Sequence, residues 1–169
     1  MTGLPGGSGG YAEYIIRKAA FVLFGITNPV IQQKVRRNND FKELWVELNG
    51  EKVLHFAIAY GFRNIQTLVR MIKSKKCPFH YVEVMACPAG CNNGGGQIRP
   101  TVLTPKELLE KVEASYHSEV DVQEPEDNST VTTIYKDWIN GGVYSNTAKS
   151  IFHTQYHMIK KLDALNTQW

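Results

Sequence analysis

The stretch KVLHFAIAYGFRNIQTLVRMIKSKKCPFHYVEVMAC, residues 52–87, decides the fold class. Residues 52–60 are almost continuously apolar at their centre, as expected for a strand covered on both faces. Residues 63–75 predict a helix, and 80–87 predict another apolar strand. One helix face carries Ile65, Leu68, Val69 and Ile72. Strand, helix and strand in this order favour a βαβ unit with a right-handed crossover. The sequence therefore predicts an α/β fold with a mostly parallel sheet flanked by helices.

The residues before this stretch predict a hairpin and a first helix. The first strand runs from Phe41 to Leu48, and Asn49-Gly50 is a strong hairpin turn signal. Further upstream, GLPGGSGG at 3–10 precedes a helical pattern formed by Tyr11, Ile15, Ala19, Val22 and Leu23. Ser8 is expected to cap that helix and Gly25 to end it. This glycine-rich turn is either an anion or cofactor site at a helix start or a plain loop end.

The carboxyl-terminal half predicts helices separated by an acidic segment. A helix from Pro105 to Tyr116 is indicated by Thr104 as its cap and by Glu107 as the partner in a capping box. Residues 118–129 are acidic and polar, which is typical of a linker. Helical segments are expected at 130–140 and 146–164, with Asn140, Gly141 and Gly142 between them.

Composition limits the possible functions. The chain has 169 residues, which suits one domain or one lobe of a larger one, and its net charge of +3 does not indicate a nucleic-acid surface. Basic clusters at Lys34, Arg36 and Arg37 and at Lys73, Lys75 and Lys76 are expected to be solvated. No apolar run approaches the ~20 residues that cross a bilayer. MTGLPGGSGG does not resemble a secretory signal, so an intracellular protein without a membrane partner is expected.

The segment EVMACPAGCNNGGGQ, residues 83–97, carries the chemistry. Cys87 and Cys91 follow a buried strand, and the carboxyl ends of parallel strands are where α/β proteins place their sites. Thiolates are soft ligands that suit iron–sulfur clusters and zinc. Gly94, Gly95 and Gly96 are expected to allow positive φ angles, close backbone approach and amide donation to sulfur. Two buried cysteines beside a tight turn are the structural alternative.

Other thiols and histidines are weaker candidates. Cys77 lies beside Lys75 and Lys76, which could lower its pKa, although an incidental cysteine is the commoner case. His153 and His157 are four apart on the last expected helix, a spacing that can bind zinc but that lacks a third ligand nearby.

Four segments together resemble one family. VEVMACPAGCNNGGGQ (82–97) resembles the last cysteine motif of the iron-only hydrogenases and of their eukaryotic relatives. Those relatives are cytosolic iron–sulfur assembly factors, the nuclear prelamin A recognition factor-like family. GSGGYAEYIIRKA (7–19), the strand and helix at 52–73, and IYKDWINGGVYSNTAKSIFHTQY (134–156) resemble the same fold in the same order. The resemblance implies a large-subunit-like lobe at 1–120, a linker at 121–129 and a small-subunit-like helical segment at 130–169.

The resemblance also implies a cofactor and partners. Cys87 and Cys91 are expected to ligate a [4Fe-4S] cluster, with Gly94, Gly95 and Gly96 beside it. The other cluster ligands of the family lie upstream, so either Cys77 and an outside ligand complete the set or, as we prefer, the chain is a carboxyl-terminal fragment or short isoform. Trp169 is expected either to dock into the cytosolic iron–sulfur targeting complex or to be a frayed chain end.

The function that this resemblance implies is non-enzymatic transfer of a cluster to cytosolic and nuclear apoproteins. A cytoplasmic location, with a nuclear one as well, follows from that role. The alternatives are a hydrogenase-type redox enzyme and a cluster-free fragment of the same fold. Gln97-Ile98-Arg99 stands where hydrogenases usually place proline directly after the glutamine, which favours the assembly role.

Overall fold

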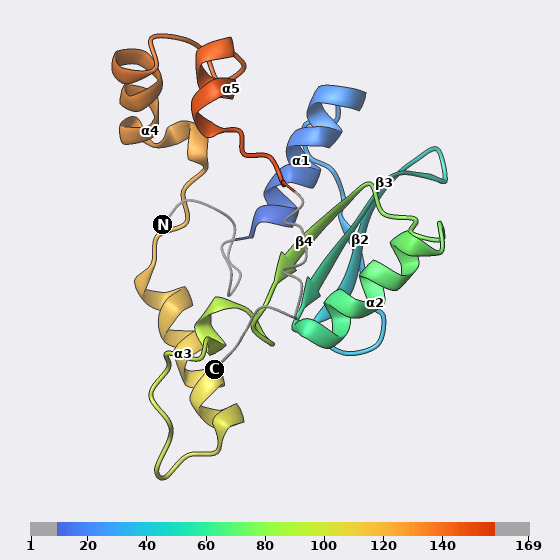
Figure 1. Cartoon of the computed structure of the whole chain (residues 1–169), viewed down its shortest axis with the longest axis vertical. Coiled ribbons are helices and arrows are strands. Elements are labelled where there is room, and N and C mark those ends of the chain that lie inside the picture. The colour runs from blue at the N-terminus through green and yellow to red at the C-terminus, as the bar shows by residue number, and fades with distance from the viewer. Residues whose placement is uncertain (1–9, 158–169) are drawn as a thin grey trace, which may run out of the picture. The chain divides into compact units, whose positions relative to one another are not determined.

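The computed structural model describes residues 10–157, which belong to two compact units that meet in sequence at Pro125 and Glu126 (Figure 1). The first unit is built on one sheet whose strands lie in the order β1-β2-β3-β4. These strands are β1 (Gln32–Val35), β2 (Phe41–Leu48), β3 (Glu51–Tyr60) and β4 (Tyr81–Met85). Within residues 10–157, no helix combines the length and apolar character that crossing a membrane requires.

The sheet is mixed. β3 and β4 are parallel and are joined by α2 (Phe62–Lys73), so the predicted βαβ unit and the α/β class are confirmed. β1 with β2 and β2 with β3 pair antiparallel, so the parallel pairing is confined to β3 and β4 rather than dominating the sheet. The expectation of a mostly parallel sheet fails because β2 and β3 form a tight hairpin, which forces antiparallel pairing.

The hairpin turn follows from two residues with positive φ. Asn49 has φ of 54° and Gly50 has φ of 83°, the left-handed pair that the favoured two-residue turns require. The predicted bounds of β2 are confirmed, and β3 begins one residue earlier than expected, at Glu51. β1 was not predicted, because all four of its residues are exposed and show no apolar alternation.

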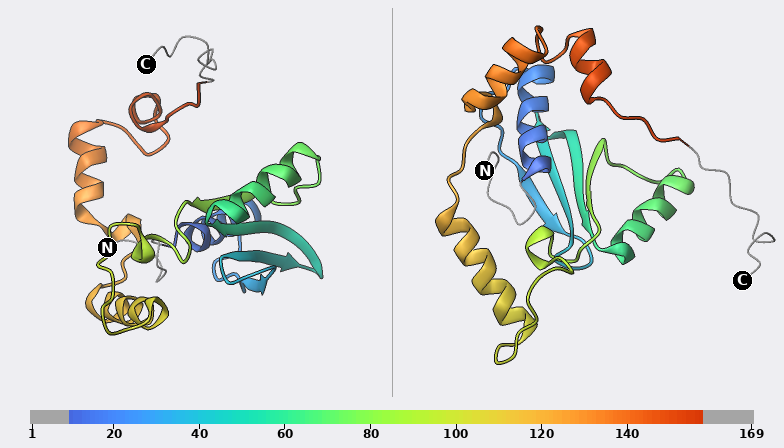
Figure 2. Two further views of the ribbon diagram at one scale, coloured as in Figure 1. Left: turned by 60° about the horizontal axis from the view of Figure 1, so that its bottom comes forward. Right: turned by 60° about the vertical axis from the view of Figure 1, so that its left-hand side comes forward.

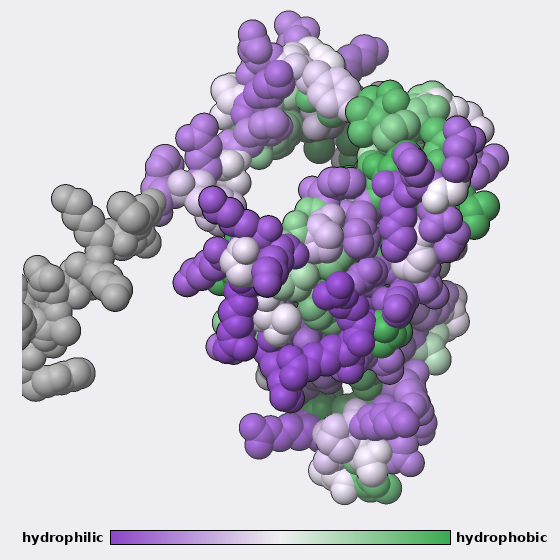
Figure 3. All heavy atoms as spheres, turned by 90° about the vertical axis from the view of Figure 1, so that its right-hand side faces the viewer, coloured by the Kyte–Doolittle hydropathy of each residue, from purple (hydrophilic) through white to green (hydrophobic). Residues whose placement is uncertain are grey.

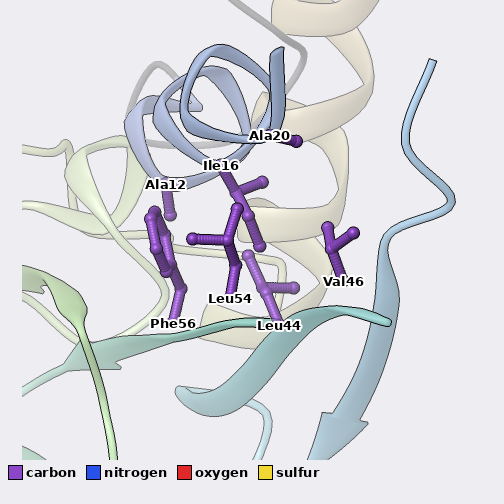
Figure 4. Close-up of a cluster of buried hydrophobic side chains, with 7 residues drawn as sticks. All are labelled: Ala12, Ile16, Ala20, Leu44, Val46, Leu54 and Phe56. Atoms are coloured by element: carbon purple, nitrogen blue, oxygen red, sulfur yellow. The ribbon is translucent and has the colours of Figure 1, made fainter. Parts of the chain in front are cut away.

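Helix α1 (Tyr11–Phe24) covers one face of the sheet. Figure 4 shows its buried side chains pointing toward apolar side chains of β2 and β3. The cluster consists of Ala12, Ile16, Ala20, Leu44, Val46, Leu54 and Phe56. Small residues on the helix allow close approach to the strands, which excludes water from this face.

The apolar residues from which α1 was predicted are not the ones that it buries. Tyr11, Val22 and Leu23 are exposed, whereas Ala12, Ile16 and Ala20 are inside. The helix begins after Gly10, which adopts the left-handed conformation and makes no side-chain cap. The predicted cap, Ser8, lies outside the described residues, and the predicted end at Gly25 is confirmed.

Helix α2 covers the opposite face of the sheet (Figure 2). Leu68 is buried there, but Val69 and Ile72 of the predicted apolar face are exposed. Asn64 takes the buried position one turn before Leu68, where its side-chain amide donates to the Tyr60 carbonyl at 2.9 Å. Six residues complete this side: Phe41, Ala57, Ala59, Met71, Phe79 and Val82.

Helix α3 (Pro105–Glu119) also belongs to the first unit and starts as predicted. The Thr104 hydroxyl accepts the Glu107 N–H at 3.3 Å, and the Glu107 carboxylate accepts the Thr104 N–H at 2.8 Å. The Thr104 N–H and the Thr104 hydroxyl both donate to the Glu107 carboxylate, and these two bonds lower the pKa of Glu107. The capping box is confirmed, and the helix runs three residues beyond its expected end at Tyr116.

The second unit is a short helical segment. It contains α4 (Ser129–Thr133), a π-helical turn over Ile134–Trp138, and α5 (Asn146–Phe152). Asn128 caps α4 and Ser145 caps α5 through their side-chain oxygens. The helix expected at 146–164 ends at Phe152 instead, and residues 158–164 lie outside the described range.

Candidate metal centre

The two candidate thiols lie on the loop that follows β4, residues 86–97, which we call the cysteine loop. Cys87 comes two residues after Met85 and is half-buried, and Cys91 is exposed at the start of the short 3-10 helix η1 (Cys91–Asn93). Because β4 pairs in parallel with β3, this loop lies at the sheet edge where α/β proteins place ligands. Cys91 is therefore open to solvent, whereas Cys87 is partly covered.

The centre of this loop is held by Asp40, which the sequence analysis did not single out. The Asp40 carboxylate accepts the backbone N–H of Ala89 at 2.7 Å, and the Asp40 carbonyl accepts the Tyr60 N–H at 2.8 Å. Ala89 has φ of 60° and Gly90 has φ of 87°, so the chain reverses direction between the two cysteines. A carboxylate in the turn that precedes β2 thus stabilises the strained part of the loop.

A second contact joins the loop to the turn between β3 and α2. Gly61 donates its N–H to the Met85 carbonyl at 2.8 Å and has φ of 77°. A Cβ atom at Gly61 would lie 3.4 Å from Pro88 Cγ. Glycine is required here for the backbone conformation, whereas a Cβ atom would make only ordinary contact with Pro88.

Side-chain amides close the far part of the loop. Asn93 donates to the Pro88 carbonyl at 3.0 Å, and Gln97 donates to the Asn92 carbonyl at 3.0 Å. The Gly94 N–H is used internally, because it donates to the Cys91 carbonyl at 3.1 Å. Cys91 thus lies on a loop whose backbone is fixed on both sides.

One of the three roles predicted for the consecutive glycines, a positive φ angle, is wrong, whereas close backbone approach and amide donation to sulfur stay predictions. Gly94 has φ of −65°, and neither Gly95 nor Gly96 adopts a positive φ. A Cβ atom at Gly95 or Gly96 would meet nothing within 4 Å, whereas one at Gly94 would lie 3.2 Å from the Cys91 carbonyl oxygen. The positive φ angles fall on Ala89 and Gly90, because the reversal takes place between the cysteines rather than after them.

Helix α3 lies against the loop on its outer side, as Figure 1 shows. The Asn92 side chain donates to the Glu113 carboxylate at 3.2 Å. Burial raises the pKa of Tyr116, and the negative charges of Cys91 and Glu113 raise it further. α3 thus places a phenol and a carboxylate next to the exposed cysteine.

A buried carboxylate on β4 lies under the start of α1. Glu83 is 4 % exposed and accepts the Ala12 N–H at 2.6 Å and the Tyr60 hydroxyl. A cavity of about 510 Å³ opens beside it, and its wall includes Gly10, Glu113 and Ala89 of the cysteine loop. Glu83 therefore fixes the first turn of α1 to the strand that leads into Cys87.

The donor set fits an iron–sulfur cluster in part. Within the described residues, no three or more His, Cys, Asp or Glu side chains form a group that could hold a metal ion. Cys87 and Cys91 would supply two of the four thiolates that a typical cluster needs, so the other ligands would have to come from elsewhere. Cys77 is half-buried after α2. The sequence predicted His153 and His157 on a helix, but both lie beyond the end of α5.

Comparison with known proteins identifies the family. The model of the iron only hydrogenase large subunit, C-terminal domain, matches residues 3–95, which is more than half of the chain. The chain belongs to this iron-only hydrogenase family. The iron hydrogenase small subunit model matches residues 105–158.

The relatives of this iron-only hydrogenase family member include named assembly factors. The chain is 47% identical over 165 residues to cytosolic Fe-S cluster assembly factor narfl of Xenopus tropicalis, covering 97% of this chain and 34% of that protein. Identity to Protein NAR1 of Arabidopsis thaliana is 47% over 164 residues, covering 95% of this chain and 34% of that protein. The chain thus spans about a third of the length of these relatives, and the predicted resemblance is confirmed.

Solved structures support the fold. A variant of FeFe-hydrogenase HydA1 from Chlamydomonas reinhardtii matches with a TM-score of 0.64 and 22% identity, over 90% of this chain and 45% of that one. A HydA(deltaEFG) structure matches with a TM-score of 0.63 and 22% identity, over 90% of this chain and 46% of that one. The hydrogenase-like fold predicted from the sequence is therefore confirmed.

Proposed function

We propose that this chain is the carboxyl-terminal part of a cytosolic iron–sulfur assembly factor and that Cys87 and Cys91 contribute thiolates to a [4Fe-4S] cluster. The observation that carries this proposal is the position of both thiols on one fixed loop at the carboxyl end of β4, with Cys91 exposed. Relatives at 47% identity are named cytosolic Fe-S assembly factors. The loop leaves open space at Gly95 and Gly96 for an inorganic core.

The protein residues would hold the cluster and would control access to it. The two thiolates supply soft ligands, and the cluster, when bound, provides iron and sulfide that can be passed on as a unit. Asp40 fixes the loop between the thiols through Ala89, and Glu113 holds Asn92 on the outer side. Because Cys91 is exposed, an acceptor protein can approach that side of the site.

A non-enzymatic role is the version of this function that we favour. The named relatives are assembly factors, whereas the solved hydrogenases are 21–22% identical and support the fold alone. In this proposal the clients are cytosolic and nuclear apoproteins, and the protein is located in the cytoplasm and also in the nucleus. Trp169, which lies outside the described residues, would bind the cytosolic targeting complex.

Transfer of the cluster tests this role. The full chain is loaded anaerobically with radiolabelled iron and sulfide and is then mixed with an apoprotein that needs a [4Fe-4S] cluster for a measurable activity. The proposal predicts that label and activity appear in the acceptor faster than with free iron and sulfide. Hydrogen evolution by the loaded chain, with no acceleration of transfer, would contradict the assembly role and favour the redox alternative.

A further inference from the structure

The basic cluster of Lys34, Arg36 and Arg37 is exposed, as the sequence predicts, but its surface is not flat. It borders a hollow of about 450 Å³ on the side of the sheet that α2 covers. The residues around the hollow are Lys34, Arg36, Arg37, Phe41, Glu43 and Thr67. A cavity of this size can hold several side chains of a ligand.

The one carboxylate in this hollow is already neutralised. Glu43 forms an ion pair with Arg36, and its other oxygen lies 3.0 Å from His55 Nε2. Burial alone would raise the pKa of Glu43, but the hydrogen bond from His55 and the charge of Arg36 outweigh burial and lower the pKa. Lys34 and Arg37 are exposed, and neither pairs with an acid in the described part of the chain.

Helix α2 adds positive charge along the same side. Arg63, Thr67 and Arg70 follow one another at helical spacing, so both arginines lie on the helix face that meets the hollow through Thr67. Both arginines are exposed. Figure 3 views the side that α2 occupies in Figure 1 and shows mostly hydrophilic residues over it. The hollow therefore has a positive field that attracts anions.

Strand β1 gives this surface a second property. It is one of the two edge strands of the sheet, its four residues are exposed, and its outer side pairs with no other strand among residues 10–157. An edge strand can accept an extended peptide through main-chain hydrogen bonds. Lys34 stands opposite Glu43 in the β1–β2 register, so it lies on the sheet face that forms the hollow.

We propose that β1 and this hollow bind an extended acidic segment of a partner protein. The backbone of the segment would pair with β1, and its carboxylates would meet Lys34 and Arg37. A peptide uses both properties of the surface, whereas a phosphate or a nucleic acid would use the cations alone. None of these residues belongs to the cysteine loop, so the inference stands apart from the cluster proposal.

Charge reversal tests the cation part of the proposal. Binding of a fluorescent peptide of about ten alternating glutamate and valine residues to the full chain is measured by anisotropy. Lys34→Glu with Arg37→Glu should weaken binding by about tenfold or more. The control, Lys106→Glu with Lys111→Glu on α3, makes the same change in net charge at exposed sites and should weaken binding by less than about twofold. Equal losses, or no binding by the unaltered chain, would overturn the proposal.

Backbone methylation tests the strand part. The same peptide methylated at alternate backbone amides cannot complete a β ladder, so its affinity should fall by about tenfold. Unchanged affinity would overturn strand addition at β1. Displacement of the peptide by a single-stranded oligonucleotide at lower concentration than by unlabelled peptide would show that the partner class is wrong.

Discussion

Asp40 and Ala89 are separated by 49 positions in the chain, yet the Asp40 carboxylate accepts the Ala89 N–H at 2.7 Å. Ala89 has a positive φ and lies between Cys87 and Cys91. A charged acceptor therefore fixes the point at which the loop reverses. Presentation of the two thiols depends on a residue in the turn between β1 and β2.

Loss of the Asp40 carboxylate should release the cysteine loop. Asp40→Ala removes the acceptor of the Ala89 N–H, at a cost of about 1–3 kcal/mol to the local structure. Hydrogen exchange of the amides in residues 87–94 should accelerate, while exchange in β2 and β3 stays slow. Asp40→Asn keeps an acceptor oxygen and should preserve most of the protection. Equal exchange in Asp40→Ala and the unaltered chain would show that this bond does not hold the loop.

Gly90, rather than Gly95, should be the glycine that the loop needs. Gly90 has φ of 87° and ψ of −164°, a region that is open almost only to glycine, so Gly90→Ala should cost about 1–3 kcal/mol of stability. Gly95 has no positive φ and free space around a Cβ atom, so Gly95→Ala should change stability little. Urea unfolding of the two variants decides between them. A larger loss at Gly95 would contradict the loop conformation described here.

The buried carboxylate of Glu83 should stabilise the start of α1. Glu83→Leu removes the acceptor for the Ala12 N–H and the Tyr60 hydroxyl, which should lower the free energy of unfolding by about 2–3 kcal/mol. Tyr60→Phe removes one of these bonds and should cost about 1 kcal/mol. Chemical denaturation of both variants measures the difference. If Glu83→Leu unfolds like the unaltered chain, the carboxylate does not fix the helix.

The free energy of unfolding should fall at acidic pH because Glu43 becomes protonated. The folded-state pKa of Glu43 lies below its ordinary value of 4.5, so the stabilisation by Arg36 and His55 is present above that pH and is lost as the pH falls through the lowered pKa. Glu43→Gln should lower the free energy of unfolding by about 1–3 kcal/mol at neutral pH and should flatten its fall below the ordinary pKa.

The control for Glu43 is Glu51→Gln, at an exposed site on the first residue of β3. This substitution should leave the free energy of unfolding at neutral pH, and its decrease at acidic pH, nearly unchanged. Unfolding curves collected across the acidic range distinguish the two variants. Equal pH profiles for both would mean that Glu43 is not the carboxylate that couples protons to folding.

Much of the fold could be predicted because its signals are local. The strand–helix–strand order of 52–87, the Asn49-Gly50 turn and the Thr104–Glu107 capping box all lie within short windows of sequence. β1 could not be predicted in this way, because its pairing with β2 forms the strand without any apolar alternation of its own.

The candidate site was predicted less completely, for a related reason. The positions of Cys87 and Cys91 after a strand were predicted from the motif, and Cys91 is exposed while Cys87 is half-buried. Asp40 and Glu83 were missed because their partners are distant in the chain, at Ala89 and Ala12. Positive φ angles were predicted at the three consecutive glycines but occur at Gly90 instead. A glycine allows a positive φ without requiring it, so the sequence does not tell which glycine adopts one.

The iron and acid-labile sulfide that the chain retains measure the central claim most directly. The full chain is reconstituted anaerobically with ferrous iron and sulfide, with glutathione present to fill the missing ligand positions. The account predicts an absorbance and iron content typical of a cluster, lost in Cys87→Ser and in Cys91→Ser and retained in Cys77→Ser. Equal iron content in all four proteins, or loss with Cys77→Ser alone, would contradict it.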